Sequence, residues 1–298
     1  MTAEFVGERI LVTGGTGYIG SALVARLRQR NDVHIVTRGA GGAGRLADTS
    51  TVRFHVVTEP ASQIGELVAS VDPTVVFHLA THYERVDDAA SLGSMVDTNV
   101  RFGSLVLGAA ARLADSAVVI AGSHFQFTES GRGAANFYAA TKSALATVAA
   151  YFGEVHGLRW CQTVLFDVYG PNDPRPKFVN AFLDRTVAGL PVMLPDPEPL
   201  HHLVYIDDVV AALLASAHSL KAGAASGEDV FVTSDHPVTP SQVLAEIGLV
   251  VGRSPEVADA PYELPPGTIM APVEGPRPAL WQPTVGLHDG LRSVFDDR

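Results

Sequence analysis

The sequence predicts an α/β fold with a doubly wound parallel sheet, followed by a smaller and irregular lobe. Three observations lead to this prediction. Short apolar runs alternate with helical patterns as far as Gly170, which is typical of a parallel sheet with helices on both faces. A glycine-rich loop joins the first apolar run to the first helical pattern. After Gly170-Pro171 the prolines cluster, and only helices and loops are expected.

Hydrophobic periodicity places the individual elements. Apolar runs predict strands at residues 9–13, 33–37, 52–57, 74–80, 117–121 and 160–166. Helical spacing between these runs predicts helices at residues 21–27, 64–71, 90–113 and 138–156. The second part of the chain repeats the helical spacing at residues 177–189, 207–219, 240–251 and 286–296. We expect the helix 207–219 to pack back on the sheet.

Composition excludes several classes of function. The chain has 298 residues, 47% of them hydrophobic, and its net charge of −11 disfavours a nucleic-acid partner. Cys161 is the only cysteine, so no internal disulfide can form, as is usual in a reducing cytosol. The N-terminus lacks a secretory pattern and no stretch is apolar enough to span a membrane. We therefore expect a cytoplasmic protein without a membrane partner.

The first loop carries a pattern that is typical of phosphate binding. Gly15-x-Gly17-x-x-Gly20 follows a strand and opens a helix, which is the context that dinucleotide sites require. Glycines permit a tight turn and a close approach of the backbone to a pyrophosphate, and the helix N-terminus offers free N–H groups. The cofactor contacts expected in this loop are Gly14, Gly15, Thr16, Gly17, Tyr18, Ile19 and Gly20.

The end of the second expected strand indicates which dinucleotide binds. An acid about 20 residues beyond the glycine loop usually holds the ribose 2′-hydroxyl of NAD. Here the strand ends in Thr37-Arg38, with no carboxylate. An arginine in this place suits a 2′-phosphate. The sequence therefore favours NADP(H) with Arg38 as a ligand, and a solvated loop charge is the alternative.

Three residues further along the chain form a pattern for hydride-transfer chemistry. Tyr138 and Lys142 stand one helical turn apart on the same helix face. A neighbouring cation would lower the pKa of the phenol, which ordinarily lies near 10. Ser123 ends a predicted strand, at the edge of the sheet where ligands bind in open α/β folds. We expect Ser123 to hold a reacting carbonyl oxygen and Tyr138 to exchange a proton with it.

Together these motifs resemble the extended short-chain dehydrogenase/reductases, the NAD-dependent epimerase/dehydratase family. The resemblance covers residues from about 8 to 220, with a looser echo at 277–296. The motifs that carry it are TGGTGYIG (13–20), HLAT (78–81), TNV (98–100), AGS (121–123), YAATK (138–142), DVYGP (167–171) and VYIDDV (204–209).

The resemblance implies roles that spacing alone does not assign. Tyr138 would donate a proton, and Lys142 would also hold the nicotinamide ribose. Such proteins often form homodimers through two long helices, here about 90–113 and 138–156. Other residues would contact the cofactor through the backbone, support the site or line the nicotinamide pocket. These residues are Leu79, Ala80, Thr81, Asn99, Phe166 and Val168.

The resemblance also implies a division into two lobes. Residues 1–170 would form a dinucleotide-binding Rossmann domain, completed by about 200–220. Residues 171–199 and 221–298 would form a smaller lobe that holds a nucleotide sugar. The boundary coincides with the cluster of prolines that begins at Pro171.

Within this family, the active-site segment favours a reductase. Dehydratases carry an Asp-Glu pair directly after the active-site serine, whereas here Ser123 is followed by His124-Phe125-Gln126. Epimerases usually carry Ala-Val-Tyr-Gly there and an acid at the end of the second strand, and both are missing. The Ser123–Gln126 stretch, the short gap to Tyr138 and the segment Gly170–Lys177 resemble the CDP-abequose and CDP-paratose synthases, which reduce the 4-keto group of a nucleotide deoxysugar.

The expected function is therefore NADPH-dependent reduction of a CDP- or dTDP-linked 4-keto-6-deoxyhexose. An NAD-dependent nucleotide-sugar 4-epimerase and a non-catalytic NADPH-sensing protein stay open as alternatives.

Lys177 and Arg277 would bind the diphosphate or be solvated surface charges. Adjacent His201 and His202 point opposite ways in an extended segment, so no metal is expected. The candidate substrate contacts are His124, Gln126, Asp167, Lys177 and Arg277.

Overall fold

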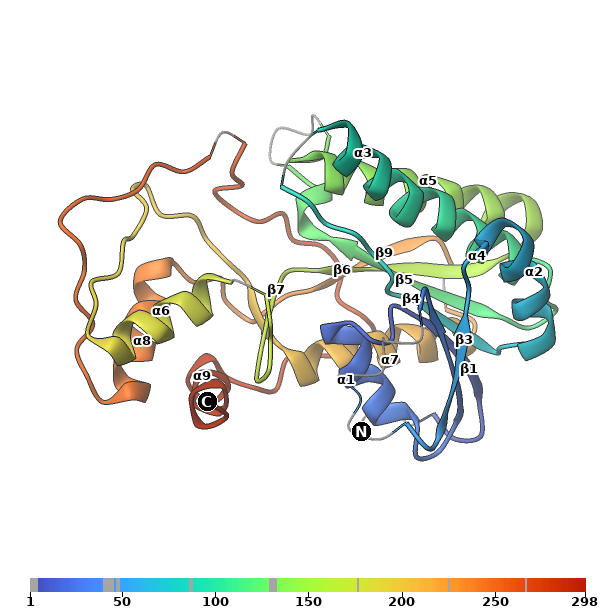
Figure 1. Cartoon of the computed structure of the whole chain (residues 1–298), viewed down its shortest axis with the longest axis horizontal. Helices are drawn as coiled ribbons and strands as arrows, with labels where there is room; N and C mark the ends of the chain where they lie inside the picture. The colour runs from blue at the N-terminus through green and yellow to red at the C-terminus, as the bar shows by residue number, and fades with distance from the viewer. Residues whose placement is uncertain are drawn as a thin grey trace.

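A parallel sheet of seven strands lies at the centre of the structure (Figure 1). The structure is a computed structural model, and it describes residues 5–39, 46, 49–85, 88–128, 133–175, 177–224, 226–265 and 267–298. The strand order is β3-β2-β1-β4-β5-β6-β9, which confirms the predicted fold class. The predicted strands are observed as β1 (Arg9–Thr13), β2 (Asp32–Thr37), β3 (Val52–Val56), β4 (Val75–His78), β5 (Ala117–Ser123) and β6 (Arg159–Leu165).

The seventh strand is not predicted by the sequence analysis. β9 (Glu228–Val232) pairs in parallel with β6, although its segment was expected to lie in the second lobe. Only the last three residues of this strand, Val230, Phe231 and Val232, form an apolar run, which is too short to predict a strand. The pairing sets Asp229 opposite Gln162.

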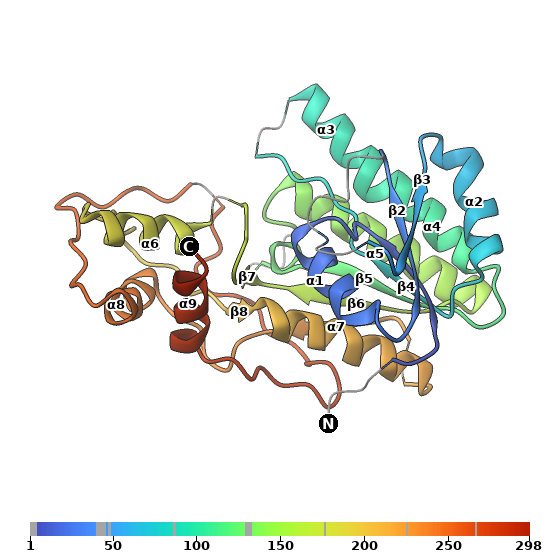
Figure 2. The same ribbon diagram turned by 60° about the horizontal axis from the view of Figure 1, so that its bottom comes forward.

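Helices cover both faces of the sheet, as predicted (Figures 1 and 2). Each face has its own hydrophobic core. The helices on one face are α2 (Pro60–Val71), α4 (Gly103–Ala110) and α5 (Phe137–His156). Those on the other are α1 (Tyr18–Leu27) and α7 (Ile206–Lys221), so the helix predicted at 207–219 does pack on the sheet.

The helix predicted over residues 90–113 is interrupted. α3 (Ala89–Met95) runs into a π-helical turn, η2 (Val96–Phe102), before α4 continues to Ala110. A π-helical turn changes the direction in which its side chains point, and such turns are frequent at functional sites. In this turn Asn99 is fully buried.

Within the described residues, three helices form the second lobe beside the sheet (Figure 2). They are α6 (Phe178–Ala188), α8 (Pro240–Val251) and α9 (Leu287–Asp296), and α8 packs against both of the others. A short parallel pair, β7 (Asp167–Tyr169) and β8 (Leu203–Tyr205), leads from the sheet into this lobe.

Asp208 fastens the C-terminal segment to α7. Its Oδ1 accepts hydrogen bonds from the Thr284 N–H (3.0 Å) and hydroxyl (2.7 Å), and its Oδ2 accepts one from the Val285 N–H (3.0 Å). The indole N–H of the buried Trp281 donates to the Asp208 carbonyl at 2.9 Å. A buried carboxylate is stabilised when its lone pairs are filled in this way.

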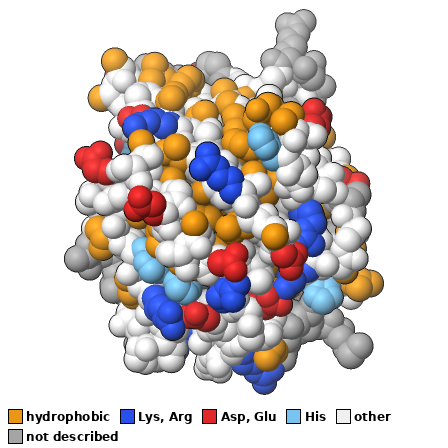
Figure 3. All heavy atoms as spheres, turned by 90° about the vertical axis from the view of Figure 1, so that its right-hand side faces the viewer, with side chains coloured by type: hydrophobic (Ala, Val, Ile, Leu, Met, Phe, Trp, Pro, Cys, Tyr) orange, Lys and Arg blue, Asp and Glu red, His pale blue; other side chains and the backbone are white. Residues whose placement is uncertain are grey.

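The surface mixes apolar and charged side chains. Figure 3 shows the face on the side of α2 and β3, where hydrophobic side chains gather in the upper part and charges are more frequent below. On α5, Tyr151 and Val155 are 52% and 59% exposed. Within the described ranges, no helix combines the length and apolar character needed to cross a bilayer.

Candidate active site

The predicted cofactor loop lies where the sheet changes its winding direction. β1 and β4 are neighbours in the sheet, and the chain leaves both of them at the same edge. Ligands of open α/β sheets bind at such a switch point. The glycine loop follows β1, and Leu79 and Ala80 follow β4.

The glycine loop has the geometry of a backbone cradle. Gly14 has a φ of +72°, and a Cβ there would lie 2.6 Å from the Ala80 nitrogen. A Cβ on Gly20 would collide with the Gly14 carbonyl. α1 begins after Gly17 without a side-chain cap and without an acidic residue in its first turn. Open N–H groups and absent side chains fit a dinucleotide pyrophosphate.

A buried threonine joins the two cofactor segments. The Thr13 hydroxyl accepts a hydrogen bond from the Ala80 N–H (3.2 Å) and shares one with His78 Nδ1 (2.8 Å). The Leu79 N–H donates to the Thr13 carbonyl at 3.0 Å. Burial lowers the pKa of His78 to about 3, so this imidazole is neutral at physiological pH. The segment beyond β4 is thereby fixed against the glycine loop.

Asn99 fastens the same segment to α5, the helix that carries Tyr138 and Lys142. Its Oδ1 accepts from the His82 N–H (2.7 Å) and the Thr81 hydroxyl (3.1 Å), and its Nδ2 donates to the His82 carbonyl (2.9 Å). The same Nδ2 donates to the Thr141 hydroxyl at 2.9 Å. Thr141 directly precedes Lys142, so the amide of Asn99 positions α5 relative to residues 81–82.

Tyr138 and Lys142 lie on the first turns of α5. The Asn136 side chain caps this helix by accepting from the Ala139 N–H at 2.9 Å. Lys142 is only 2% exposed, and its Nζ lies 6.0 Å from the centre of the Tyr138 ring. Its ammonium makes no hydrogen bond or ion pair with a residue in the described ranges. Burial lowers the pKa of this ammonium to about 8.

The pKa of Tyr138 is raised, contrary to the expected lowering by Lys142. Burial of the phenol is the largest cause, and a hydrogen bond with the Thr81 side chain opposes it only in part. The Tyr83 ring stands edge-on to the Tyr138 ring at 5.1 Å and shields it further. A phenol with a raised pKa stays protonated at neutral pH, which is the form that can donate a proton.

Ser123 ends β5 and begins a short 3-10 turn, η3 (His124–Gln126). Its hydroxyl oxygen accepts from the Phe125 N–H at 3.4 Å, and its own N–H donates to Gln126 Oε1 at 2.8 Å. Gln126 also donates through Nε2 to Gln162 at 3.2 Å. The polar groups of Gln126, predicted to contact substrate, are thus bonded to protein partners.

His124 lies against the predicted nicotinamide pocket. Its ring is 5.0 Å from that of Phe166, and both Phe166 and Val168 are buried. Burial lowers the pKa of His124 to about 4, so the ring is neutral. Its Nδ1 has no hydrogen-bond partner among the residues that the structure describes. A buried nitrogen without a partner is costly, and a ligand group would satisfy it.

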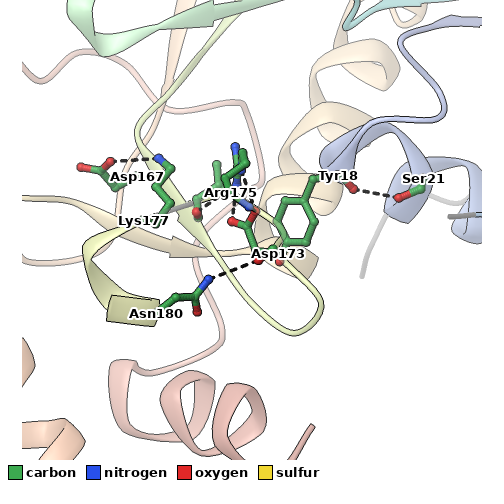
Figure 4. A network of polar contacts seen from close by, with 8 residues as sticks. Tyr18, Ser21, Asp167, Asp173, Arg175, Lys177 and Asn180 are labelled. Atoms are coloured by element: carbon green, nitrogen blue, oxygen red, sulfur yellow. Dashed lines mark hydrogen bonds and ion pairs between the residues drawn. The ribbon is translucent and has the colours of Figure 1, made fainter. Parts of the chain in front are cut away.

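Asp167, the first residue of β7, is the centre of a polar cluster with Lys177, which precedes α6, and His201, which precedes β8. Its Oδ1 is 3.2 Å from Lys177 Nζ, and its Oδ2 is 2.9 Å from His201 Nδ1 (the Lys177 pair is drawn in Figure 4). Burial favours the neutral acid, but the Lys177 ammonium and His201 together hold the pKa of Asp167 well below its usual range. The structure therefore brings together Asp167 and Lys177, two of the predicted substrate residues.

Arg175 is a site residue that the sequence analysis missed. Its guanidinium carbon lies 4.8 Å from the centre of the Tyr18 ring, and its Nη2 is 2.6 Å from Asp173 Oδ2 (Figure 4). The same nitrogen donates to the Val168 carbonyl at 3.3 Å. The loop after β7 is thus fixed against the glycine loop. The only sequence signal was a basic residue in a proline-rich segment.

Arg277 and Arg38 stand in contrasting environments. Arg277 donates to the Thr233 hydroxyl (3.0 Å) and the Ser234 carbonyl (2.8 Å), and it pairs with Asp235 (3.1 Å). Its guanidinium is therefore occupied by protein groups. Arg38 is exposed just beyond β2 and has no ion pair with any residue within the described ranges. That position leaves it available to an anion.

The remaining reactive side chains do not form a site. Within the part of the chain that the structure describes, no three His, Cys, Asp or Glu side chains gather as metal ligands. Cys161 is buried in β6, and burial raises the pKa of its thiol to about 12. A thiol of this kind is unreactive at neutral pH.

Known proteins resemble this chain in sequence and in fold. CDP-abequose synthase from Yersinia pseudotuberculosis is 26% identical over 208 residues, which are 69% of this chain and 72% of that protein. The solved structure of UDP-N-acetylglucosamine 4-epimerase from Methanobrevibacter ruminantium superposes with a TM-score of 0.84 at 21% identity, over 98% of both chains. At that identity the likeness concerns the fold alone.

A second solved structure is closer in sequence. UDP-glucose 4-epimerase from Thermus thermophilus, in complex with NAD, has a TM-score of 0.77 and 26% identity over 97% of this chain and 98% of that one. The sequence profile of a family described as "NAD dependent epimerase/dehydratase family" matches residues 10–232, which is most of the chain. With its glycine loop, its Tyr138/Lys142 pair and its parallel sheet, the chain belongs to the NAD dependent epimerase/dehydratase family.

Proposed function

We propose that this protein is an NADPH-dependent reductase of the 4-keto group of a nucleotide-diphospho-4-keto-6-deoxyhexose. The observation that carries the proposal is Lys142, a lysine buried beside Tyr138 without a carboxylate partner in the described ranges. Lysine is almost never buried unless it is paired. The free-energy cost of burying an unpaired charge is typical of sites where that charge binds a ligand or takes part in a reaction.

The catalytic residues would act on the carbonyl oxygen of the sugar. When bound, a reduced nicotinamide would supply the hydride that the carbonyl carbon accepts. Ser123 donates a hydrogen bond to the oxygen on which negative charge develops, and Tyr138 delivers a proton to it. Lys142 stabilises the phenolate left by that transfer. Preorganised donors of this kind are each worth about 3 kcal/mol or more in the transition state.

The protonation state of Tyr138 fits a reductase. Burial raises the pKa of this phenol, so it keeps its proton at neutral pH and can donate it to the carbonyl oxygen.

The cofactor preference rests on the end of β2. Arg38 is exposed there, with no ion pair to a residue in the described ranges and no acid at the position that usually binds a ribose 2′-hydroxyl. We assign the 2′-phosphate of NADPH to Arg38. The pyrophosphate would lie on Gly14–Gly20 and the nicotinamide near Phe166 and Val168.

The substrate class rests on the relatives and on the polar cluster. The similarity to CDP-abequose synthase favours a CDP-linked sugar, and a dTDP-linked sugar is the second choice. His124 offers an unpartnered nitrogen beside Phe166, and the Asp167–Lys177 pair provides a cation. We assign His124 to the sugar and Lys177 to the diphosphate.

The test is loss of NADPH absorbance with a panel of CDP- and dTDP-4-keto-6-deoxyhexoses. Turnover of at least one of them with NADPH is expected. Tyr138→Phe removes the proton donor, so kcat is expected to fall by about 100-fold or more while NADPH still binds. Tyr151→Phe, on the exposed side of the same helix, is the matched control. Unchanged turnover in Tyr138→Phe contradicts the assigned role.

A 4-epimerase is the second candidate, because several of the solved structures that share this fold, including the two described above, are 4-epimerases. Such an enzyme would hold NAD through each catalytic cycle and need no added reductant. Purified protein that arrives with bound NAD, and that interconverts nucleotide sugars without NADPH, would favour this function over the reductase. NADPH binding without turnover of any sugar would favour a sensing role instead.

We also propose a homodimer through the helices at about 90–113 and 138–156. Three large hydrophobic side chains are exposed on these helices: Tyr151 and Val155 on α5, and Val96 at the start of η2. Burial of apolar surface drives association of this kind. Light scattering is expected to give twice the chain mass, and Val155→Glu is expected to reduce it to that of one chain.

A further inference from the structure

A chain of side-chain hydrogen bonds crosses three strands below the catalytic serine. It begins at Asp229 on β9, passes through Gln162 on β6 and ends at Gln126, which bonds to Ser123. We propose that Asp229, Gln162 and Gln126 are positioning residues that fix Ser123 for the reaction. The effect of these residues on turnover rests on the proposed function, whereas their effect on the position of Ser123 does not.

The geometry of the chain follows from strand register. β6 and β9 pair so that Gln162 is directly opposite Asp229. Neighbouring residues on paired strands present their side chains on the same face. Gln162 Nε2 donates to Asp229 Oδ1 at 2.8 Å, Gln126 Nε2 donates to Gln162 Oε1 at 3.2 Å, and the Ser123 N–H donates to Gln126 Oε1 at 2.8 Å.

The two ends of this hydrogen-bond series impose the same direction on its bonds, because the Ser123 N–H only donates and an ionised Asp229 only accepts. An ionised carboxylate only accepts, whereas each glutamine amide has one donating end and one accepting end. Gln162 must therefore turn its NH₂ toward Asp229 and its carbonyl toward Gln126. Gln126 must in turn offer its NH₂ to Gln162 and its carbonyl to Ser123. Without the carboxylate, only the Ser123 N–H opposes reversal of the two amides, since a reversed Gln126 would turn its NH₂ group toward that N–H.

Packing holds the two amides in place. Gln162 and Gln126 are 1% and 8% exposed, so water does not compete for their polar groups. Gly122 lies against both of them, since a Cβ there would be 2.7 Å from Gln162 Cγ and 2.9 Å from Gln126 Oε1. Glycine at this position of β5 gives the amides the space to pass.

The last hydrogen bond of the series, from the Ser123 N–H to Gln126, affects how the Ser123 hydroxyl is placed. The bond from the Ser123 N–H to Gln126 completes a reciprocal cap on η3, in which the Ser123 oxygen accepts from the Phe125 N–H at 3.4 Å. That bond uses a lone pair of the oxygen and leaves the hydroxyl hydrogen to donate. Donation to the carbonyl oxygen of a substrate is the role assigned to Ser123.

The test exploits the fixed direction of the bonds. Asp229→Asn keeps the shape but replaces a group that only accepts with an amide that can present either end, so the Ser123 N–H alone then holds the direction of the bonds. Faster hydrogen exchange of the Ser123 amide is expected. Gln126→Glu added to Asp229→Asn places the carboxylate at the other end. In the double variant, the new carboxylate at position 126 would accept hydrogen bonds from the Ser123 N–H and from the NH₂ group of a reversed Gln162. The carbonyl of Gln162 would then accept a hydrogen bond from the NH₂ group of the asparagine at position 229. Exchange in the double variant is expected to return toward that of the wild type.

Turnover provides the second measurement. A misplaced catalytic group can cost on the order of 100-fold, so kcat of Asp229→Asn is expected to fall by about tenfold or more with an unchanged Kd for NADPH. The double variant is expected to recover much of this loss, whereas Gln126→Glu alone is expected to be impaired because Gln162 then faces two carboxylates. Glu228→Gln, on the exposed neighbouring residue of β9, is the control.

Two outcomes overturn the inference. One is a Ser123 amide that exchanges at the wild-type rate in Asp229→Asn. The other is a double variant that exchanges as fast as Asp229→Asn, since a purely structural role of Asp229 predicts no rescue by a second charge change. Hydrogen exchange needs no substrate. Wild-type protein that reduces no sugar in the panel would therefore refute the proposed function, while the exchange measurements would still decide whether Asp229, Gln162 and Gln126 position Ser123.

Discussion

Replacement of Lys142 by methionine is expected to stabilise the fold while it abolishes turnover. Lys142 is buried and has no anionic partner in the described ranges. A charge in such a place opposes folding, because it loses its hydration without gaining a counter-ion. Methionine has a similar length and no charge, so it fills the same space without that cost.

The pKa of the ammonium gives the magnitude. Burial lowers it from the ordinary 10.5 to about 8. Since each pKa unit corresponds to about 1.4 kcal/mol, the buried charge costs about 3 kcal/mol at neutral pH. For a chain of 298 residues, an unfolding entropy of about 2.1 cal/mol/K per residue converts this into a rise in Tm of about 5 °C.

The pH dependence has a definite sign. Below pH 8 the lysine is charged in both the folded and the unfolded chain, so the full cost is present. Between pH 8 and 10.5 the unfolded chain keeps a proton that the folded chain has released, so the wild-type protein gains stability as the pH rises. Lys142→Met lacks this gain. The difference in Tm between the two proteins is therefore expected to shrink above pH 8.

Calorimetry of both proteins from about pH 7 to about pH 10, with NADPH-linked turnover on the same samples, measures these effects. Lys221→Met is the control, because Lys221 pairs with Glu8 and its loss is expected to lower Tm. A Lys142→Met protein that melts no higher than the wild type, or by a margin that does not change with pH, would show that the buried charge does not oppose folding.

Two further substitutions test the cofactor and the lobe. Arg38→Asp removes the cation assigned to the 2′-phosphate, and a charged hydrogen bond is worth about 1.5–3 kcal/mol, so kcat/KM with NADPH is expected to fall about 10- to 100-fold while that with NADH does not. An equal loss with both cofactors contradicts the assignment. Asp208→Ala leaves the donors of Thr284 and Val285 without their acceptor and is expected to lower the free energy of unfolding by about 3 kcal/mol, measured in urea. A change below about 1 kcal/mol would show that solvent replaces these bonds.

Features that depend on local spacing could be predicted from the sequence. The glycine loop was placed because three glycines follow a strand and open a helix, and the structure shows how Gly14 and Gly20 leave room for the backbone. Tyr138 and Lys142 were paired because residues four apart share a helix face, and α5 carries both of them. The turn and the helix face involve neighbours along the chain, whereas the backbone that passes close to Gly14 belongs to Leu79 and Ala80.

The electrostatics of the site could not be predicted in the same way. The sequence analysis expected Lys142 to lower the pKa of Tyr138, and the structure raises it. The main cause is desolvation by burial; Tyr83 raises the pKa further, and a hydrogen bond with Thr81 lowers it only in part. Spacing along α5 contains no information about those neighbours.

Local periodicity was enough to establish most of the strands and helices, the glycine loop and the Tyr138/Lys142 pair. It could not reveal what the buried polar groups bond to, and that became visible only in the folded chain. Gln126 meets Gln162 because β5 and β6 lie side by side, and Asp229 joins them because β9 adds to the sheet edge. Hydrogen bonds and desolvation depend on distances in space, and those are fixed only when remote segments pack together.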